Sequence, residues 1–277
     1  MAQFVAQRHM TKSNDKKIES IAPSDKEEWG DFAKTAGAAI LLALIIRTFL
    51  FEPFNIPSGS MIPTLLVGDY LFVSKYEYGY SRYSFPLGMG GFDGRIMASE
   101  PNRGDVIVFK LPTDTSIDYI KRVVGMPNDT VQVTNGRLYI NGKVVPREFV
   151  ETQSYDSDDG SKITVTEYKE TLPNGVEHSI FEESDNGALD NTPLYTVPEG
   201  HYFMMGDNRD NSRDSRVLDL VGYVPFDHLV GRAEFLFFST NGFASLFEPW
   251  AWPWTIRYDR LFDKIGNGEV VKDNHGS

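Results

Sequence analysis

The sequence predicts a mainly β protein: an antiparallel β domain with an inserted smaller β-rich region, preceded by one N-terminal transmembrane helix. Three observations predict this class. One long apolar stretch lies near the N-terminus, short runs rich in β-branched and aromatic residues follow after about residue 65, and no run of helical periodicity comes after the apolar stretch. With 277 residues, 41% of them hydrophobic, the chain is long enough for one large or two small domains with a real core.

The apolar stretch runs from residue 32 to residue 51 and contains only two charged residues, Lys34 and Arg47. A helix of about 20 residues is about 30 Å long, which matches the hydrocarbon core of a bilayer. Arg47 lies close to the end of the stretch, where its long side chain can reach the membrane surface. A buried core helix is the alternative. A cleaved signal peptide fits less well, because the stretch begins about thirty residues into the chain.

The charges on either side of this stretch predict its orientation. Lys26 and Lys34 flank its amino end, whereas no Lys or Arg lies between Arg47 and Lys75. Positive residues beside a transmembrane helix favour the cytoplasmic side. The sequence therefore predicts a single-pass protein with a cytoplasmic tail over 1–31 and the rest of the chain, from about residue 52, on the outer side.

Short runs bounded by Gly, Pro or Asp predict the strands. The pairs Asn135-Gly136 and Asn141-Gly142 predict tight hairpins, because both central residues of such a turn need positive φ. The runs predicted as strands or hairpins lie at 69–76, 105–110, 118–124, 130–145, 194–207 and 229–240.

Three segments depart from this pattern. Residues 84–102 are rich in glycine and predict an irregular loop, since neither the strand nor the helix that a phosphate-binding loop requires is evident. Residues 151–191 are acidic and poor in apolar side chains, which indicates an inserted excursion or a small second domain with one or two hairpins. Residues 243–258 hold three of the four tryptophans, which indicates either local packing or contact with the membrane interface.

Composition and motif spacing argue against several classes of function. The formal net charge of -12 argues against nucleic acid as a partner, because binding it needs a basic face. The chain has no cysteine, so it has neither a disulfide nor a cysteine metal site. Residues 207–219 resemble a calcium loop only loosely, since Arg209 and Ser212 take its third and sixth positions. None of the five histidines lies in a segment typical of a Ser-His-Asp triad. The sequence predicts no metal and no cofactor.

Two serines in the stretch FNIPSGSMIPT, residues 54–64, are candidate nucleophiles. Ser58 and Ser60 stand in a tight frame of glycine and proline, which by itself indicates only a turn. A serine nucleophile needs a base, and a neutral lysine can serve. In the run DYIKRVVG, Lys121 could be that base, whereas Arg122 cannot lose its proton. The pKa of Lys121 would have to fall from about 10.4 to about 7–8, and the alternative is a solvated surface lysine.

Residues 206–216, GDNRDNSRDSR, mix acidic and basic side chains directly after an apolar run. This pattern indicates either a polar surface turn or a network of ion pairs around a hydroxyl. Together with the two preceding features, it resembles bacterial type I signal peptidase (leader peptidase), a membrane-bound serine protease with a Ser/Lys dyad. The resemblance covers the membrane segment and most of residues 52–145 and 200–240. Its four blocks, in order, are PSGSMIPTLLVGDY, RGDVIVFK, DYIKRVVGMP and GDNRDNSRDSR.

The resemblance implies a role for particular residues. Ser60 would be the nucleophile and Lys121 the general base, while Ser58 would supply an oxyanion donor beside the backbone N–H of Ser60. The serine that orients the lysine and the Asp and Arg that hold this region together fall on Ser212, Asp214 and Arg216. The apolar walls of the substrate pockets fall on Phe54, Ile56, Pro57, Leu71, Val108 and Ile120.

The resemblance further implies an endopeptidase that cleaves N-terminal signal peptides from exported preproteins after a small-x-small site. Its partners would be those signal peptides and the lipid bilayer, near the secretion translocon. It would lie in the bacterial inner (plasma) membrane, with a catalytic domain of residues 52–150 and 192–277 on the periplasmic or outer face. Two alternatives remain: a Ser/Lys peptidase dedicated to one secretion or conjugation component, and a non-catalytic peptide-binding membrane protein.

The chain departs from the pattern of that family at two places. Arg213 stands where a small residue is common, and the run SRVLDLVGYVP is longer than usual and lacks a tryptophan. Both departures lie near the expected pocket, so they bear on its shape and leave the dyad as it is.

Overall fold

The computed structural model describes residues 25–85, 91–156, 162–241 and 248–265. The chain forms two compact units, one up to Ala43 and one from Leu44 to the end. Most of the predicted cytoplasmic tail, residues 1–24, lies outside the described residues, as do residues 243–247 of the tryptophan-rich segment.

Helix α1 runs from Asp25 to Phe49. Within the described residues it is the one helix long and apolar enough to cross a membrane, over Trp29–Phe49, with a mean hydropathy of 1.6. It begins earlier than the predicted stretch of 32–51 and ends two residues sooner, because Phe51 already lies in a strand. Pro53 disfavours helical geometry at the residue before it, which fits this early end.

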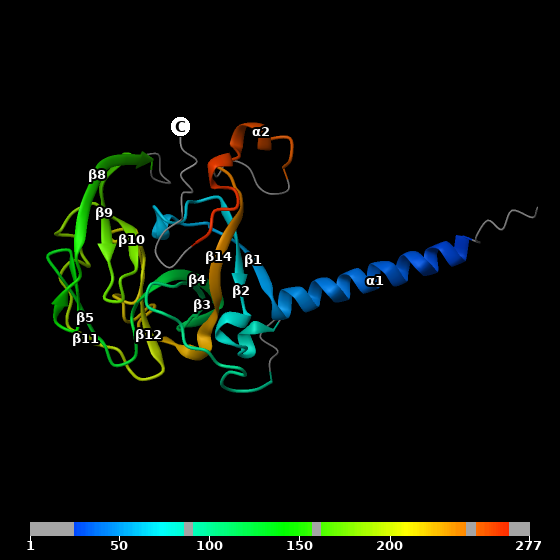
Figure 1. The fold of residues 1–277 in the computed structure, drawn as a ribbon, viewed down its shortest axis with the longest axis horizontal. Coiled ribbons are helices and arrows are strands. Elements are labelled where there is room, and N and C mark those ends of the chain that lie inside the picture. Colours follow the sequence, from blue (N-terminus) through cyan, green and yellow to red (C-terminus); the bar gives the residue numbers. More distant parts are fainter. Residues whose placement is uncertain (1–24, 86–90, 157–161, 242–247, 266–277) are drawn as a thin grey trace, which may run out of the picture. The chain divides into compact units, whose positions relative to one another are not determined.

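The main sheet has seven strands in the order β1-β2-β14-β3-β4-β12-β13, and every pairing in it is antiparallel (Figure 1). Strands β2, β3, β4, β12 and β14 fall within or around runs that the sequence predicts, whereas β1 was not predicted. The strands are β1 Phe51–Asn55, β2 Asp69–Ser74, β3 Val106–Leu111, β4 Asp114–Gly125, β12 His201–Met205, β13 Val224–Pro225 and β14 Leu229–Ser239.

Two smaller antiparallel sheets accompany the main one. The four-stranded sheet, in the order β11-β5-β6-β7, contains both Asn-Gly turns, and all four turn residues have positive φ as the hairpin prediction requires. The three-stranded sheet β10-β9-β8 forms most of the acidic region 151–191. Their strands are β5 Thr130–Thr134, β6 Arg137–Ile140, β7 Lys143–Val144, β8 Arg147–Asp156, β9 Lys162–Thr171, β10 Glu177–Glu182 and β11 Tyr195–Thr196. The mainly antiparallel β class is confirmed.

The other helices in the described part of the chain are short. They are η1 Gly59–Met61, η2 Tyr76–Tyr78, η3 Arg82–Ser84, η5 Phe226–His228, α2 Trp252–Thr255 and η6 Tyr258–Arg260.

Residues 84–102 form no named strand, in line with the irregular loop that the sequence predicts there, although residues 86–90 are outside the described residues.

Apolar side chains form three core clusters, of which one underlies the turn with the two serines. We call it the apolar cluster. It gathers residues from β1, β2, β3 and β14, so the main sheet supports that turn from below. Its buried members are Ile56, Met61, Leu65, Leu71, Val73, Val106, Val108, Val230, Ala233, Leu236 and Ile265, and the half-buried Phe54 and Ile120 pack against it.

Candidate active site

Ser60 lies in the one-turn helix η1, directly after β1. Its neighbours Ile56 and Met61 are buried in the apolar cluster, which fixes the turn on the main sheet. Ser60 itself is only 8% exposed, whereas Ser58, at the start of η1, is exposed. The two hydroxyls lie 3.4 Å apart. The two serines therefore differ: one is held inside the protein and the other stands at its rim.

Lys121 reaches Ser60 from strand β4. Its Nζ lies 2.7 Å from Ser60 Oγ and 2.9 Å from the carbonyl oxygen of Ile120. The lysine is 4% exposed, and its ammonium group lies 5.2 Å from the centre of the Tyr119 ring. Burial lowers the pKa of Lys121 to about 8, with Arg216 acting in the same direction and the carboxylates of the loop acting against it. A serine hydroxyl and a lysine that can be neutral near pH 8 are thus in contact.

The segment 206–216, which we call the ionic loop, holds the serine turn from the other side. The backbone N–H of Asn208 donates to the carbonyl of Ser60 at 3.2 Å, and its side-chain amide donates to the carbonyl of Gly59 at 3.1 Å. A Cβ on Gly206 would collide with the side chain of Ser212 and with the carbonyl oxygen of Ser60. The close approach of the loop to the serine turn therefore requires glycine at position 206.

A buried ion pair fixes the first half of the ionic loop. Arg122 donates to both carboxylate oxygens of Asp207, at 2.8 and 2.6 Å, and each side chain is 1% exposed. Asp207 also accepts from Thr64 Oγ1 at 2.6 Å, and Arg122 donates to the carbonyl of Gly104 at 2.8 Å. Such a two-pronged pair fixes direction as well as distance. The arginine beside Lys121 therefore anchors the loop that faces the lysine.

A second buried pair fixes the other half of the loop. Arg216 donates to both oxygens of Asp214, each at 2.9 Å, and to the carbonyl of Arg209 at 2.6 Å. Asp214 also accepts from the backbone N–H of Gly206 at 3.0 Å. Arg216 and hydrogen bonds lower the pKa of Asp214 even though burial acts to raise it, so this carboxyl stays ionised.

The loop is also tied to the three-stranded sheet. Arg209 donates to both oxygens of Glu170 on β9, at 3.0 Å for the longer contact. His178 on β10 is fully buried, with Nε2 3.4 Å from Glu170 Oε1 and 3.9 Å from Asp207 Oδ1. Burial, Arg122 and Arg209 lower the pKa of His178 well below its ordinary value, so this side chain is neutral at pH 7. We call Arg122, Glu170, His178, Asp207, Arg209, Asp214 and Arg216 the ionic network.

Ser212 lies in the ionic loop and is 5% exposed. Its hydroxyl makes no well-formed hydrogen bond among the described residues, although it is near enough to Asp214 to help lower the pKa of that carboxyl. A buried hydroxyl without a well-formed bond keeps open donor and acceptor capacity.

Comparison with known proteins identifies the family. The family model for signal peptidase, peptidase S26, matches residues 29–238. The chain belongs to the signal peptidase S26 family. It is 41% identical to the signal peptidase I of Rickettsia conorii (strain ATCC VR-613 / Malish 7) over 94% of this chain and 98% of that protein. It is 44% identical to the signal peptidase I of Rickettsia felis (strain ATCC VR-1525 / URRWXCal2) over 83% and 84%.

A solved signal peptidase I from Enterococcus faecalis V583 also matches, at 28% identity over 48% of this chain and 97% of that one, with a TM-score of 0.28. The assignment to the family rests on the family model and the Rickettsia relatives. Membership makes this chain a serine endopeptidase, a hydrolase of peptide bonds. Family membership and the long apolar helix α1 together indicate a membrane-anchored protein.

In this signal peptidase, five of the six residues expected to line the substrate pockets belong to one cluster or pack against it. Only Phe54 and Ile120 are partly exposed, while Ile56, Leu71 and Val108 are at most 3% exposed. The exposed Pro57 lies outside the cluster. The buried three can therefore shape a pocket only from beneath, and their binding role stays a prediction. Arg213, the departure from the family pattern, is exposed.

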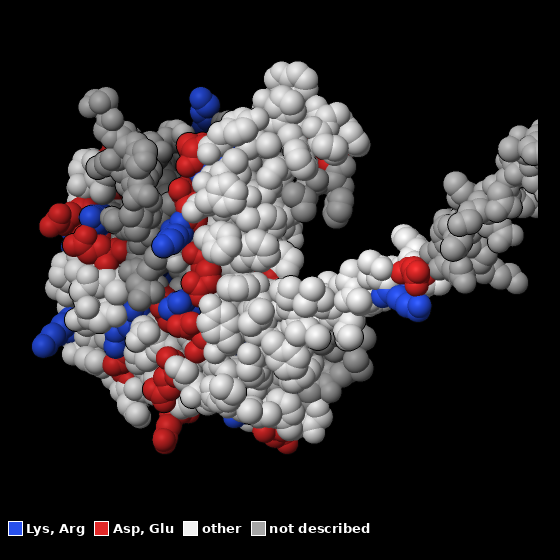
Figure 2. All heavy atoms as spheres, turned by 45° about the vertical axis from the view of Figure 1, so that its right-hand side comes forward, with Lys and Arg blue, Asp and Glu red and all other residues white. Residues whose placement is uncertain are grey.

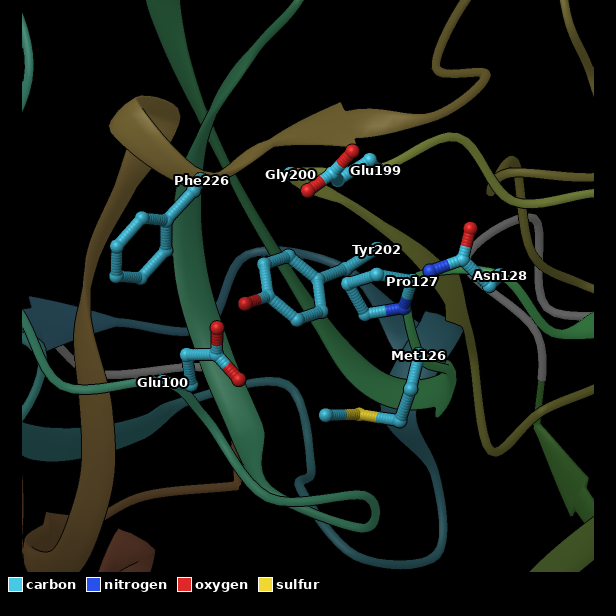
Figure 3. A pocket seen from close by; sticks show the side chains of 8 residues that line it. All are labelled: Glu100, Met126, Pro127, Asn128, Glu199, Gly200, Tyr202 and Phe226. Atoms are coloured by element: carbon cyan, nitrogen blue, oxygen red, sulfur yellow. The ribbon is translucent and has the colours of Figure 1, made fainter.

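The structure also has a cavity of about 370 Å³ that neither Ser60 nor Lys121 lines (Figure 3). Its acidic groups are Glu100 and Glu199, and burial and Glu100 raise the pKa of Tyr202 to about 12. The cavity therefore lacks the pairing of nucleophile and base that the serine turn has. Its walls are Glu100, Met126, Pro127, Asn128, Glu199, Gly200, Tyr202 and Phe226.

Sequence reasoning missed part of this site. It treated Arg122 only as a residue that cannot be a base, and it counted Asp207 only as one of several charges in a possible ion-pair network; Asn208 and Gly206 received no role. The adjacency of Lys and Arg on one strand, and the Gly-Asp-Asn run, were the available signals. Glu170 and His178 gave no local signal, because their partners lie far along the chain.

Proposed function

We propose that this chain removes signal peptides from exported preproteins, with Ser60 as nucleophile and Lys121 as general base. The observation that carries the proposal is the 2.7 Å contact between the Lys121 amine and the Ser60 hydroxyl in a buried setting. A buried lysine with a pKa of about 8 is a usable base near neutral pH.

The proposed reaction begins with the neutral amine of Lys121 taking the proton of the Ser60 hydroxyl. Ser60 Oγ then attacks the carbonyl carbon of the scissile bond, and Lys121 returns the proton to the leaving amine. A water, activated by the same lysine, releases the acyl group from the serine. The Ile120 carbonyl, which accepts from Lys121 at 2.9 Å, helps to aim the amine.

Ser58 and the backbone N–H of Ser60 are the proposed donors to the developing oxyanion. The exposed Ser58 hydroxyl lies 3.4 Å from Ser60 Oγ, on the side from which a peptide can enter. Donors placed where charge develops stabilise the transition state more than the substrate. Ser212 is the proposed orienting group for Lys121, and the Asp214–Arg216 pair is its support.

The proposed specificity for small side chains before the cut rests on the apolar surroundings of Ser60. The half-buried Phe54 and Ile120 offer apolar walls, and a shallow apolar wall disfavours large or charged side chains. An extended peptide beside β1 could pair with this edge strand, which has β2 on its other side. We infer that residues 52–150 and 192–277 act as the catalytic domain and that 151–191 is an addition to it.

The proposed lipid partner is supported by an aromatic surface on the unit that begins at Leu44. Figure 2 shows a broad face almost free of charged side chains, on the side of β1, β2 and α2. The ring centres of Phe72 and Phe237, on neighbouring strands, lie 4.4 Å apart, and both side chains are partly exposed. Trp250 and Trp254 are 71% and 81% exposed. Tryptophan is enriched at membrane interfaces, so this face suits a position on the outer leaflet.

Cleavage of a panel of signal-peptide substrates by the full chain in detergent tests the proposal. We expect the wild type to cut after small-x-small sites and Ser60→Ala to lose cleavage to background while its melting temperature stays within a few degrees of wild type. Ser116→Ala, an exposed serine on β4, is the matched control and should cleave normally. Cleavage by Ser60→Ala, or a folded wild type that cuts none of the substrates, would overturn the proposal.

A further inference from the structure

Three acidic side chains converge at a point that the proposed catalysis does not use. One carboxylate oxygen from each of Glu182, Asp190 and Asp210 lies within 4.8 Å of the others. Glu182 ends β10, Asp190 lies in the following segment, and Asp210 belongs to the ionic loop. Glu182 and Asp190 are only 3% and 1% exposed. The fold therefore holds two carboxylates away from solvent beside the half-buried Asp210, and like charges repel more strongly where water is excluded.

The carboxylates are fixed in place by one oxygen each. Asp190 Oδ2 accepts from the backbone N–H of Gly187 at 2.6 Å, and Asp210 Oδ2 accepts from the backbone N–H groups of residues 183 and 184, at 2.7 and 3.1 Å. By contrast, Glu182 Oε2 and Asp190 Oδ1 are buried and have no hydrogen-bond partner among the residues that the structure describes. A buried carboxylate oxygen without a partner is costly, so both oxygens point to a missing ligand.

The nearby arginines do not balance this negative charge. Arg147 lies 3.4 Å from Glu182 Oε1, but its other terminal nitrogen pairs with Asp185 at 2.7 Å. Both terminal nitrogens of Arg209 donate to Glu170. The cluster therefore favours an added positive charge, either a proton or a cation.

We propose that Glu182, Asp190 and Asp210 bind a divalent cation, with Ca²⁺ as the preferred ion. Ca²⁺ binds carboxylate oxygens at about 2.3–2.6 Å, so two of its ligands lie at most about 5 Å apart, which fits the observed spacing. The donors are all oxygens, which suits a hard cation and not zinc or copper. A Cβ on Gly187 would collide with Asp210, so glycine there allows the segment after β10 to approach the ionic loop closely.

A cation at this point would join the three-stranded sheet to the ionic loop. Asp210 lies between Asn208, which donates to the Ser60 carbonyl, and Ser212. The ion would hold the middle of the loop, while the two buried ion pairs hold its ends. Its expected effect is on stability, so it can be measured independently of cleavage.

Thermal unfolding of the full chain in detergent, after treatment with a chelator, tests this site. We expect millimolar Ca²⁺ to raise the melting temperature by about 3–6 °C, beyond a sodium chloride control of equal ionic strength. Glu182→Gln and Asp190→Asn should lose this rise. With chelator alone they should melt at or above the wild-type temperature, because each keeps the shape of the side chain and leaves one ionisable group fewer at the buried point. Glu148→Gln, an exposed glutamate on β8, is the matched control and should keep the full rise.

Calorimetric titration with Ca²⁺ should give one site in the wild type and in Glu148→Gln, and none in the two cluster variants. The proposal is wrong if Ca²⁺ gives no rise beyond the salt control, because the cluster would then be balanced by a proton. A rise that persists in both cluster variants would place the ion elsewhere and overturn the assignment. An equal response to Mg²⁺ would overturn the preference for calcium.

Discussion

Two very different surroundings meet at the turn that carries Ser60. On one side the apolar cluster packs Ile56 and Met61 against the main sheet. On the other side the ionic network holds the Ser60 carbonyl through Asn208, which follows the buried Asp207. The first surrounding is non-directional and depends on area, whereas the second fixes distances and angles.

The two surroundings contribute different properties to the site: one sets the pKa of Lys121 and the other sets the geometry. Burial by apolar neighbours makes the charged form of Lys121 unfavourable, which lowers its pKa. Burial alone does not aim the lysine at a hydroxyl, and the ionic network supplies the fixed frame for that. Buried ion pairs contribute little net stability, so their value here lies in geometry. Five predictions test this difference between the two surroundings, in order of decreasing size of the effect.

Replacing Lys121 should separate activity from stability most sharply. Lys121→Met should lose cleavage by about 10⁴-fold or more, since the proposed base is then absent. It should also be more stable at pH 7 by about 3 kcal/mol, because a lysine with a pKa of about 8 in the fold and 10.5 outside is held charged at a cost. This penalty persists below pH 8 and shrinks between pH 8 and about 10.5, so wild-type stability should rise with pH across that window.

Denaturant unfolding and a cleavage assay measure both effects. Lys121→Arg is the second variant, because guanidinium keeps a positive charge and cannot act as a base. Cleavage by Lys121→Arg would remove Lys121 from the role of base.

Breaking the ionic network should lower stability strongly. Asp207→Asn leaves Arg122 charged and buried without its carboxylate, which should cost about 3–5 kcal/mol of unfolding free energy. The matched control is Asp118→Asn, which breaks the more exposed pair with Lys110 and should cost about 1 kcal/mol or less. Equal losses of unfolding free energy in the two variants would mean that the buried ionic network holds the loop no more firmly than a partly exposed ion pair would.

Removing the Ser58 hydroxyl should affect the rate and leave the fold intact. Ser58→Ala should lower kcat by about 10²–10³, as expected for one lost oxyanion donor. Because Ser58 is exposed, its melting temperature should match that of the wild type. Steady-state kinetics on a signal-peptide substrate check this, and an unchanged kcat would leave Ser58 with a role only in the turn.

The pH dependence should report the buried lysine directly. If the neutral amine of Lys121 is the base, as proposed, kcat/KM should rise about tenfold per pH unit below about 8 and level off above it. A profile measured from pH 6 to pH 10 checks the position of the bend. A rise that continues without levelling off up to pH 10, as the ordinary lysine pKa of 10.5 would give, would contradict the desolvation of Lys121 by its surroundings.

Trimming the apolar side should have the smallest effect, on preference more than on rate. Ile120→Ala widens the half-buried wall, so the ratio of kcat/KM for a larger side chain before the cut to that for alanine should rise about tenfold. Ile117→Ala, an exposed isoleucine on the same strand, is the control and should leave that ratio unchanged. A ratio unaffected by Ile120→Ala would place the specificity wall elsewhere.

Much of the fold follows from local patterns. The two Asn-Gly pairs set the hairpins of the four-stranded sheet, and short β-branched runs became strands of the main sheet. Strand β1 was missed because its run, FEPFN, continues the apolar helix and contains a proline, which argues against a strand. Its place at the edge of the sheet, where proline is tolerated, depends on pairing with β2.

The class of the protein, its apolar anchor segment and the serine and lysine of the proposed dyad follow from local sequence patterns. The tertiary structure was needed to show that Lys121 is buried against Ser60 and that its pKa falls, because desolvation comes from side chains far apart in the chain. It likewise decided that Arg209 meets Glu170, and that Glu182, Asp190 and Asp210 share one buried point. A spacing in sequence carries no information about such contacts, since strand pairing and loop closure set them.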